Sequence, residues 1–332
     1  MTILVTGGAG YIGAHVVRLL MQRGAEVVVV DDLSTGSTTR VGDVPLVEID
    51  IAADVAVGKL TAAMHEHGVD SVIHIAAKKQ VGESAQRPAW YYTQNVGGTA
   101  NVLSAMQEAG VARMMFSSSA ATYGLPDIVP GTLIAEDAEA RPISPYGETK
   151  LACEWMIRAA SAAWGLRSVN LRYFNVAGSG WNDLGDPGVF NLIPIVMKQV
   201  TDGQQPKVFG DDYPTPDGTC VRDYVHVLDL ADAHLAALDY LDRDDDRPFD
   251  VFNVGTGTGA SVRDVLVEVA AATGYDTTPE VVERRPGDPA SLVADVTRIQ
   301  QVLGWRAKDS TLRAIVASAW AAWPRVHGNP AH

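Results

Sequence analysis

The chain has 332 residues, which is enough for one large domain or two. Its net charge of -14 argues against nucleic acid or an anionic membrane as the main partner. The two cysteines, Cys153 and Cys220, provide neither a disulfide framework nor a zinc-ligand pattern, so we expect no metal site. No apolar run is long enough to span a bilayer, and no signal-peptide pattern precedes the first strand-like run. These features predict a cytoplasmic protein.

The N-terminal segment has the pattern of a dinucleotide-binding unit. Thr2–Thr6 is a short strand-like run, and Gly7, Gly10 and Gly13 follow it before an apolar helical run. A second strand, residues 26–30, ends in Asp31. Glycines allow the backbone to approach a pyrophosphate at the helix N-terminus, where free N–H groups favour negative charge. A carboxylate after the second strand accepts hydrogen bonds from a ribose and repels a 2′-phosphate, which favours NAD over NADP.

Strands and helices continue to alternate after this unit. Strand-like runs at residues 44–49, 70–76, 113–116 and 168–173 are separated by helical runs at 57–65, at 88–108 and from Pro145. This alternation predicts an α/β fold with a Rossmann-type, doubly wound parallel sheet. Ligands in such folds gather beyond the carboxyl ends of the strands. The polar residues Asp50 and Ser117–Ser119 directly follow two of these strands.

Residues 144–150 contain a candidate acid–base pair. Pro145 suits the first turn of a helix, and Tyr146 and Lys150 then share one helix face because they are four residues apart. A phenol has a pKa of about 10 and is a weak base at neutral pH. An ammonium beside it favours the phenolate and lowers that pKa. The pair is therefore suited to interconverting a hydroxyl and a carbonyl group.

The regular alternation ends after residue 173. Residues 175–191 predict a long loop, residues 191–200 and 230–241 helices, and residues 221–227 and 252–254 strands. We interpret Gly255–Gly259 as a turn into a helix capped by Ser261, because no strand ending in an acid follows it. We therefore predict an NAD-binding domain over residues 1–175 and a smaller C-terminal α/β substrate domain over residues 176–328. Segments near residues 224–255 are expected to pack back on the first domain.

The sequence resembles the extended short-chain dehydrogenase/reductases. The resemblance rests on Thr6–Gly13, Ser117–Ser119 and the Tyr146/Lys150 pair. The later motifs Val81-Gly-Glu-Ser84, Arg172-Tyr-Phe-Asn175, Asp217–His226 and Arg285-Pro-Gly-Asp288 are similar to those of the UDP-hexose 4-epimerase family. The similarity runs nearly end to end. It implies reversible, NAD-dependent epimerisation of UDP-glucose and UDP-galactose at C4 through a transient 4-keto sugar, in a homodimer of galactose metabolism.

The resemblance also implies roles for individual residues. Tyr146 would be the acid/base, Lys150 would bond the nicotinamide ribose and lower the tyrosine pKa, and Ser119 would bond the sugar hydroxyl. The implied NAD contacts are Gly7, Gly10, Tyr11, Ile12, Gly13, Asp31, Asp32, Leu33, Asp50, Ile51, Ala76, Lys79, Asn95, Ser117, Tyr146, Lys150 and Phe174. The implied contacts with the UDP-hexose are Ser119, Tyr146, Asn175, Asn191, Leu192, Phe209, Arg222, Arg285 and Asp288. Two arginines suit a diphosphate through charge-assisted hydrogen bonds.

Three departures from the family pattern leave alternatives open. The stretch Gly178–Val189 is short beside the usual substrate loop, and Cys220 stands where glycine is frequent. Leu292 falls at a gate position, where tyrosine accompanies plain hexoses and a small residue admits N-acetylated sugars. A UDP-N-acetylhexosamine or another UDP-sugar therefore stays an alternative substrate. An alternative from another class is a non-catalytic, dinucleotide-sensing regulator, although such a protein would not need the Tyr146/Lys150 pair.

Overall fold

The structure is a computed structural model, and it describes residues 1–125, 131–243, 248–285 and 287–328. The chain divides into two compact units, and each is described by itself. The first unit comprises Met1–Gly124, Glu139–Arg172 and Ala231–Phe252. The second comprises Leu125–Ala138, Tyr173–Leu230 and Asn253–His332.

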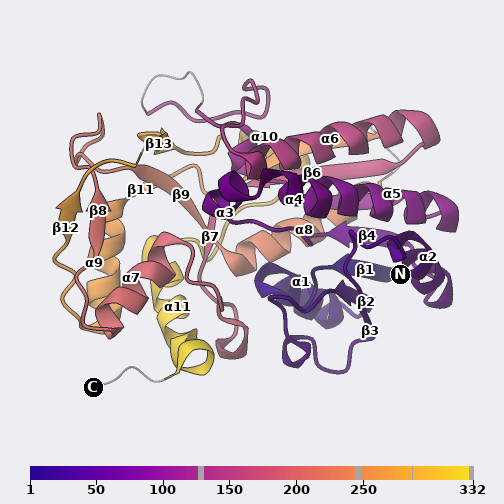
Figure 1. The fold of residues 1–332 in the computed structure, drawn as a ribbon, viewed down its shortest axis with the longest axis horizontal. Coiled ribbons are helices and arrows are strands. Elements are labelled where there is room, and N and C mark those ends of the chain that lie inside the picture. Colours follow the sequence, from indigo (N-terminus) through magenta and orange to yellow (C-terminus); the bar gives the residue numbers. More distant parts are fainter. Residues whose placement is uncertain (126–130, 244–247, 286, 329–332) are drawn as a thin grey trace. The chain divides into compact units, whose positions relative to one another are not determined.

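A seven-stranded sheet forms the centre of the first unit (Figure 1). The strand order is β10-β6-β5-β4-β1-β2-β3, and neighbouring strands from β3 to β6 pair in parallel. The order reverses at β1, so β2 and β4 lie on either side of it, which is the switch point of a doubly wound sheet. The predicted α/β class is confirmed. The strands are β1 (Thr2–Thr6), β2 (Glu26–Asp31), β3 (Leu46–Glu48), β4 (Ser71–His74), β5 (Arg113–Ser117), β6 (Arg167–Tyr173) and β10 (Phe249–Val254).

Helices cover both faces of this sheet. On one face α2 (Ala56–Glu66), α5 (Gly98–Ala109) and α6 (Pro145–Trp164) bury an apolar core with side chains of β1, β4 and β5. On the other, α1 (Tyr11–Gln22) packs on β1 and β2, and α8 (Val227–Leu241) bonds Ser117 through His234. Ser117 and Ser118 point to opposite faces, because side chains alternate along an extended chain.

The helix predicted over residues 88–108 is present, and it contains a π-helical turn. Short helices α3 (Val81–Gln86) and α4 (Pro88–Tyr91) lead into a π-helical turn, Tyr92–Gly97, and only then does α5 begin. The predicted helix is therefore confirmed, and only the π-helical turn within it was not foreseen, because periodicity does not reveal an extra residue in one turn. Inside the turn, the amide of Asn95 bonds the backbone of Lys78 and the hydroxyl of Thr149. π-Helical turns inside α-helices are frequently found at functional sites.

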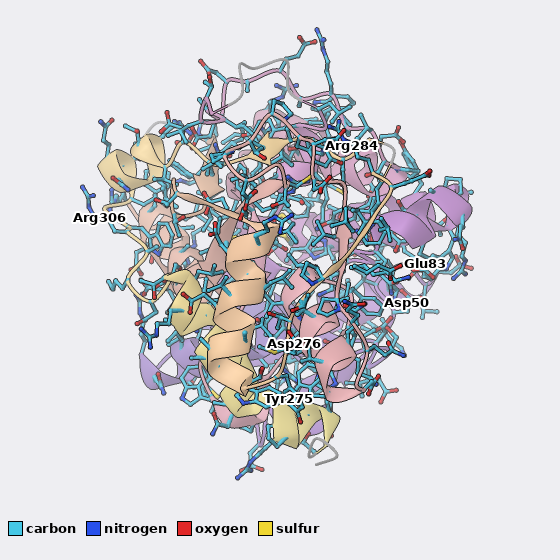
Figure 2. All side chains as sticks on the ribbon, turned by 90° about the vertical axis from the view of Figure 1, so that its left-hand side faces the viewer. Asp50, Glu83, Tyr275, Asp276, Arg284 and Arg306 are labelled. Atoms are coloured by element: carbon cyan, nitrogen blue, oxygen red, sulfur yellow. The ribbon has the colours of Figure 1, made fainter. Side chains whose placement is uncertain are left out.

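The second unit has small sheets and four helices among the residues described. β7 (Asn175–Ala177), β9 (Val221–His226), β11 (Gly259–Ser261) and β13 (Ser291–Leu292) form one sheet, and β8 (Lys207–Phe209) pairs with β12 (Glu280–Val282). The helices are α7 (Leu192–Thr201), α9 (Val262–Thr273), α10 (Thr297–Val302) and α11 (Leu312–His327). α7, α9 and α11 share a core. Tyr275, labelled at the end of α9 in Figure 2, meets Trp320 of α11 edge to face.

The glycine run at residues 255–259 is a structural turn, as predicted. The buried carboxylate of Asp223 accepts hydrogen bonds from the backbone N–H groups of Thr256 (2.8 Å) and Gly257 (3.0 Å). After the short strand β11, Ser261 and Asp264 form a capping box at the start of α9. An internal carboxylate therefore satisfies the N–H groups that a nucleotide phosphate would need.

Both cysteines are buried and free. Over the described ranges, His, Cys, Asp and Glu side chains form no group of three or more that could hold a metal ion. In the same part of the chain, no helix combines the length and apolar character needed to cross a membrane.

Candidate active site

The glycine turn brings the backbone of β1 close to the start of α1. Gly7 has φ +71°, and a Cβ there would lie 2.7 Å from the backbone nitrogen of Ala76. A Cβ on Gly13 would lie 2.0 Å from the carbonyl oxygen of Gly7. Gly10 is the N-cap of α1, whose first turn contains no acidic residue. The first N–H groups of a helix have no intrahelical acceptor, so this end is available to an anion.

Asp31 lies at the end of β2, beside this turn. Its carboxylate accepts hydrogen bonds from the backbone N–H groups of Ala9 and Leu33, both at 2.9 Å. Burial raises the pKa of Asp31, and the two backbone hydrogen bonds oppose that rise. Leu33 has the positive φ of 53°, a conformation uncommon outside glycine and frequent at functional sites. The carboxylate is fixed in orientation and keeps acceptor capacity for hydroxyl groups.

The neighbouring polar residues are also fixed by local contacts. Asp32 accepts a 2.9 Å hydrogen bond from the ammonium of Lys78, the neighbour of the predicted contact Lys79. Lys79 lies 5.9 Å from the ring centroid of Tyr11. Asp50, after β3, accepts a hydrogen bond from the backbone of Ala52. Its neighbour Ile51 is buried, and a Cβ on Gly98 would lie 2.9 Å from the Ile51 side chain.

The first unit fits a dinucleotide with two anionic phosphates and a free ribose 2′-hydroxyl. A side chain at Gly7 or Gly13 would fill the space that a close backbone approach requires. The start of α1 offers N–H groups and the positive end of a helix dipole. Asp31 offers a fixed acceptor for hydroxyl groups. These features match NAD.

The helix α6 begins as predicted, and it presents Tyr146 and Lys150 on one face. Ser144 caps it by accepting a 3.2 Å hydrogen bond from the N–H of Gly147, and Pro145 occupies the first turn. Tyr146 is buried and hydrogen-bonds Ser119. The ammonium of Lys150 donates a 2.7 Å hydrogen bond to the carbonyl oxygen of Ser117. The sequence-predicted catalytic residues Ser119, Tyr146 and Lys150 are therefore brought together.

The electrostatics of this pair differ from the expectation. Burial raises the pKa of Tyr146, and the hydrogen bond with Ser119 opposes that rise only in part. Burial also lowers the pKa of Lys150 to about 8. In the ligand-free protein Lys150 therefore does not bring the tyrosine pKa below its ordinary value. Spacing places an ammonium near a phenol, but the desolvation of both groups depends on the packed structure.

Sequence analysis missed two groups that contact the serine segment. Ser117, expected at the cofactor, directs its hydroxyl to His234 of α8 at 2.9 Å. Ser118 donates a 2.5 Å hydrogen bond to Glu154, which lies four residues after Lys150. The spacing Tyr146-Lys150-Glu154 was a readable signal, because all three residues fall on one stripe of a helix.

In the second unit, four of the predicted UDP-binding residues meet. The guanidinium of Arg285 stacks 3.7 Å from the ring centroid of Phe209. Arg222 donates hydrogen bonds to the carbonyl oxygens of Val221 (2.8 Å) and Pro289 (2.9 Å) and lies 3.7 Å from Asp288. Within the described residues the Arg285 guanidinium has neither an ion pair nor a hydrogen bond. Leu292, which the family resemblance assigns to the gate position, is the strand partner of Arg222 across β9 and β13.

The remaining predicted residues of this unit are placed by separate elements. Asn175 opens β7 opposite Tyr224, and the backbone of Phe174 bonds Val254. Asn191 is the N-cap of α7, and Leu192 is its first residue. The Asn191 side chain is exposed and caps no N–H group of that helix.

The short loop at residues 178–189 is anchored to α11. The backbone N–H of Ser179 donates a 3.1 Å hydrogen bond to Ser318, and the ring of His327 bonds the carbonyl of Asp186 at 2.9 Å. Gly185 lies so close to α11 that a Cβ there would be 2.9 Å from the Cβ of Ala322. The loop is therefore held by the C-terminal helix.

Comparison with known proteins assigns the family. The model of the NAD dependent epimerase/dehydratase family matches residues 3–255. A UDP-glucose 4-epimerase of Halalkalibacterium halodurans is 45% identical, covering 98% of this chain and 96% of its own length. The chain belongs to the UDP-glucose 4-epimerase family.

Solved structures of the family have the same fold. A UDP-glucose 4-epimerase of Brucella ovis in complex with NAD is 41% identical, with a TM-score of 0.89, covering 96% of this chain and 97% of its own. A UDP-glucose 4-epimerase of Stenotrophomonas maltophila, with bound NAD and formylated UDP-arabinopyranose, is 40% identical with a TM-score of 0.88, covering the same shares of the two chains. The family resemblance seen in the motifs is confirmed.

Proposed function

We propose that this protein interconverts UDP-glucose and UDP-galactose by inverting C4 of the hexose, with NAD as its resident cofactor. The observation that carries the proposal is the face of α6, on which Tyr146 and Lys150 meet the Ser117–Ser119 segment in a buried site. Family membership supports the same reaction. A dinucleotide sensor would gain nothing from burying a phenol and an amine together at a cost in desolvation.

The first unit would hold the cofactor. The glycine turn and the start of α1 would receive the pyrophosphate, and Asp31 would accept hydrogen bonds from the adenosine ribose. Asp50 and Ile51 would border the adenine, and the other contacts from this unit would be Tyr11, Ile12, Asp32, Leu33, Ala76, Lys79, Asn95 and Ser117. Phe174 is a further predicted contact. Lys150 would bond the nicotinamide ribose. Bound NAD would supply the acceptor and donor of hydride that a reversible oxidation at C4 requires.

Tyr146 would transfer the proton. Its phenolate would take the proton of the sugar 4-hydroxyl as C4 becomes a ketone and would return it after the sugar has turned. Burial disfavours the phenolate, and the hydrogen bond with Ser119 opposes this effect. The positive charge of Lys150 would add to that stabilisation. Ser119 would hydrogen-bond the same oxygen of the sugar.

The second unit would hold UDP. Arg285 stacks on Phe209 with its guanidinium still unpaired among the described residues, which preorganises it for a phosphate. Arg222 and Asp288 would bind nearby, and Asn175, Asn191 and Leu192 would add polar and backbone contacts. Many contacts with UDP and few with the hexose would allow the 4-keto sugar to turn about its bonds to the diphosphate and present its other face.

This assignment keeps the predicted division of labour, with an NAD-binding part over residues 1–175 and a UDP-sugar-binding part over residues 176–328. The grouping of Ala231–Phe252 with the first unit supports the expectation that segments near residues 224–255 pack back on it.

A UDP-N-acetylhexosamine or another UDP-sugar is the second candidate substrate. Leu292 is half-buried beside Arg222 and is intermediate in size between the two kinds of gate residue. A relative with the same fold was solved with formylated UDP-arabinopyranose. A panel of plain and N-acetylated UDP-sugars, analysed by product epimer, distinguishes the two candidates.

The proposal is tested by incubating the purified protein with UDP-galactose and measuring UDP-glucose in a coupled assay without added NAD. We expect turnover from retained cofactor. Tyr146→Phe should lose turnover by roughly 10²- to 10⁴-fold while UDP affinity stays unchanged. Tyr240→Phe is the matched control, because Tyr240 is equally buried but bonds Asp250. If Tyr146→Phe kept more than a few per cent of turnover, the assigned role would be wrong.

We further propose a homodimer that acts in galactose metabolism in the cytoplasm. The family resemblance and the acidic composition support this assignment. Light scattering on a sizing column tests the dimer, and a monomer over the working concentration range would contradict it.

A further inference from the structure

A third residue of α6 continues the stripe formed by Tyr146 and Lys150. Glu154 follows Lys150 by one helical turn, and each of the three residues contacts one of three consecutive serines. Tyr146 bonds the hydroxyl of Ser119, and Lys150 donates to the carbonyl of Ser117. Glu154 accepts a 2.5 Å hydrogen bond from the hydroxyl of Ser118. The helix therefore holds the serine segment at three successive points.

Glu154 is itself held by a buried arginine from β6. Arg172 donates a 2.9 Å hydrogen bond from Nε to Oε1 and a 2.6 Å hydrogen bond from Nη2 to Oε2 of Glu154. The side chains of Arg172 and Glu154 are only 8% and 4% exposed. The guanidinium also lies 4.9 Å from the ring centroid of Tyr123. Removing two charged side chains from water costs desolvation free energy, which offsets much of the Coulomb attraction between them. Stability alone therefore does not explain why this pair is buried.

We propose that Glu154 is a positioning residue for proton transfer: anchored by Arg172, it fixes Ser118 and thereby aligns Ser119 with Tyr146 and the carbonyl of Ser117 with Lys150. Its negative charge, in addition, favours the ammonium form of Lys150. Neither Glu154 nor Arg172 needs to touch the substrate for this role. This inference rests on the proposed function, in which Tyr146 and Lys150 transfer the proton.

The charges around Lys150 support the electrostatic part. Burial lowers the pKa of Lys150 to about 8, and Cys153 and Glu154 oppose that change. Burial raises the pKa of Cys153, so near neutral pH it is mainly an uncharged thiol. On β4, burial holds the pKa of His74 at about 3, so that ring is neutral. With Tyr146 protonated in the ligand-free protein, Glu154 is the main negative charge acting on the amine.

The test compares four variants of the full-length protein. Glu154→Gln removes the charge but keeps the shape, and Glu154→Asp restores the charge on a shorter side chain. Glu154→Gln/Arg172→Gln removes both charges and guards against misfolding caused by an unpaired buried arginine. Ser161→Ala is the matched control, because Ser161 and Ser168 form another buried polar pair between α6 and β6, 3.3 Å apart.

Two readouts are measured for each variant. The first is the pH profile of kcat and KM for UDP-galactose. The second is the titration of Lys150 itself, followed by NMR of protein labelled at the lysine side chains and assigned by the loss of one signal in Lys150→Met. The second readout does not depend on turnover.

We expect Glu154→Gln to lower kcat by about ten- to a hundredfold, the loss typical of misplacing a catalytic group, with KM changed less than about twofold. Removing the negative charge of Glu154 favours deprotonation of Lys150 and Tyr146. The pKa of Lys150 measured by NMR, and the pH values at which kcat rises and falls, should therefore move down by roughly one unit. The double variant should show the same direction of shift. Glu154→Asp should restore the pH profile and part of kcat, and Ser161→Ala should match the wild type.

The inference is overturned if the Lys150 titration and the pH profile of Glu154→Gln coincide with those of the wild type, or if Ser161→Ala shows the same losses. A general loss of packing would lower kcat without the shift and would affect the control equally. If the wild type itself failed to epimerise UDP-galactose, the proposed function would fall, whereas the Lys150 titration would still test the effect of Glu154.

Discussion

Gly13→Ala is the substitution whose effect can be worked out most directly. A Cβ at this position would lie 2.0 Å from the carbonyl oxygen of Gly7 and 2.7 Å from the Cα of Gly8. Ordinary van der Waals contact begins at about 3.4 Å, so the first distance is more than an ångström short. Both atoms belong to the backbone, so rotamer changes cannot relieve the clash. The glycine turn must open.

The cost follows from two opposing terms. Overpacking against backbone costs about 3 kcal/mol, at the upper end of the usual range. Alanine recovers roughly 0.5–1 kcal/mol in a helix, because glycine has more conformational freedom to lose. We expect a net loss of about 2 kcal/mol in the free energy of unfolding. Displacing two N–H groups from the cofactor phosphates, at roughly 1–1.5 kcal/mol each, should weaken NAD binding about 30- to 150-fold.

Gly58→Ala provides a matched control. Gly58 is also the third residue of its helix, α2, but a Cβ there would meet nothing within 4 Å. This variant should be as stable as the wild type or more stable by up to about 1 kcal/mol, with unchanged NAD content.

The assay combines urea unfolding of cofactor-free protein with measurement of NAD retained on purification and of the Kd for added NAD. If Gly13→Ala retained wild-type NAD content and stability, the close approach of α1 to the turn would be needed neither for stability nor for NAD binding, and the reasoning would be wrong. Equal losses in Gly58→Ala would point to a general sensitivity of the unit and would also contradict the reasoning.

Three further predictions concern stability and specificity. Burial holds the pKa of His74 at about 3, below its ordinary 6.5. Between these two pH values the unfolded chain therefore binds a proton at His74 that the folded protein does not bind. The free energy of unfolding should therefore fall as pH drops below 6.5, by about 2 kcal/mol between pH 7 and pH 5. In urea titrations, His74→Gln should reduce this dependence of the free energy of unfolding on pH. An unchanged dependence would contradict the assignment. Asn170 is fully buried in β6, and its amide nitrogen and oxygen have no hydrogen-bond partner among the described residues. Asn170→Leu should therefore raise the free energy of unfolding by about 1–2 kcal/mol. A urea midpoint below that of the wild type would show that the amide does form hydrogen bonds. Leu292→Ala should raise the kcat/KM ratio of N-acetylated to plain UDP-hexoses about tenfold, and Leu292→Tyr should lower it; equal ratios in both variants would exclude this position as the gate.

The local patterns of the sequence were sufficient for the first half of the fold. The glycine turn, the acid at the end of β2 and the start of α6 at Ser144-Pro145 were all read correctly, because each depends on contacts within a few residues. The turn at Gly255–Gly259 was also read correctly. Its reason, the carboxylate of Asp223, lies more than thirty residues away and could not be seen in the sequence.

The features that the sequence did not reveal have a common physical origin. The π-turn at Tyr92–Gly97 and the raised pKa of Tyr146 both depend on groups that are distant in sequence. The hydrophobic periodicity of the sequence predicts a helix, but it does not predict the hydrogen bonds of the Asn95 side chain with Lys78 and Thr149, which form only in the folded protein. Spacing places Lys150 beside Tyr146, but the desolvation that shifts both pKa values depends on the surrounding core.

The sequence by itself determined the family, the class of fold and the two residues proposed to transfer the proton, because these depend on residue type and short spacing. Only the tertiary structure decided which partners those residues meet. Glu154 became visible as the third contact of the serine segment, and Arg172 as its anchor, once β5, β6 and α6 were packed together. Hydrogen bonds and desolvation act over a few ångströms in space, and a linear chain does not record those distances.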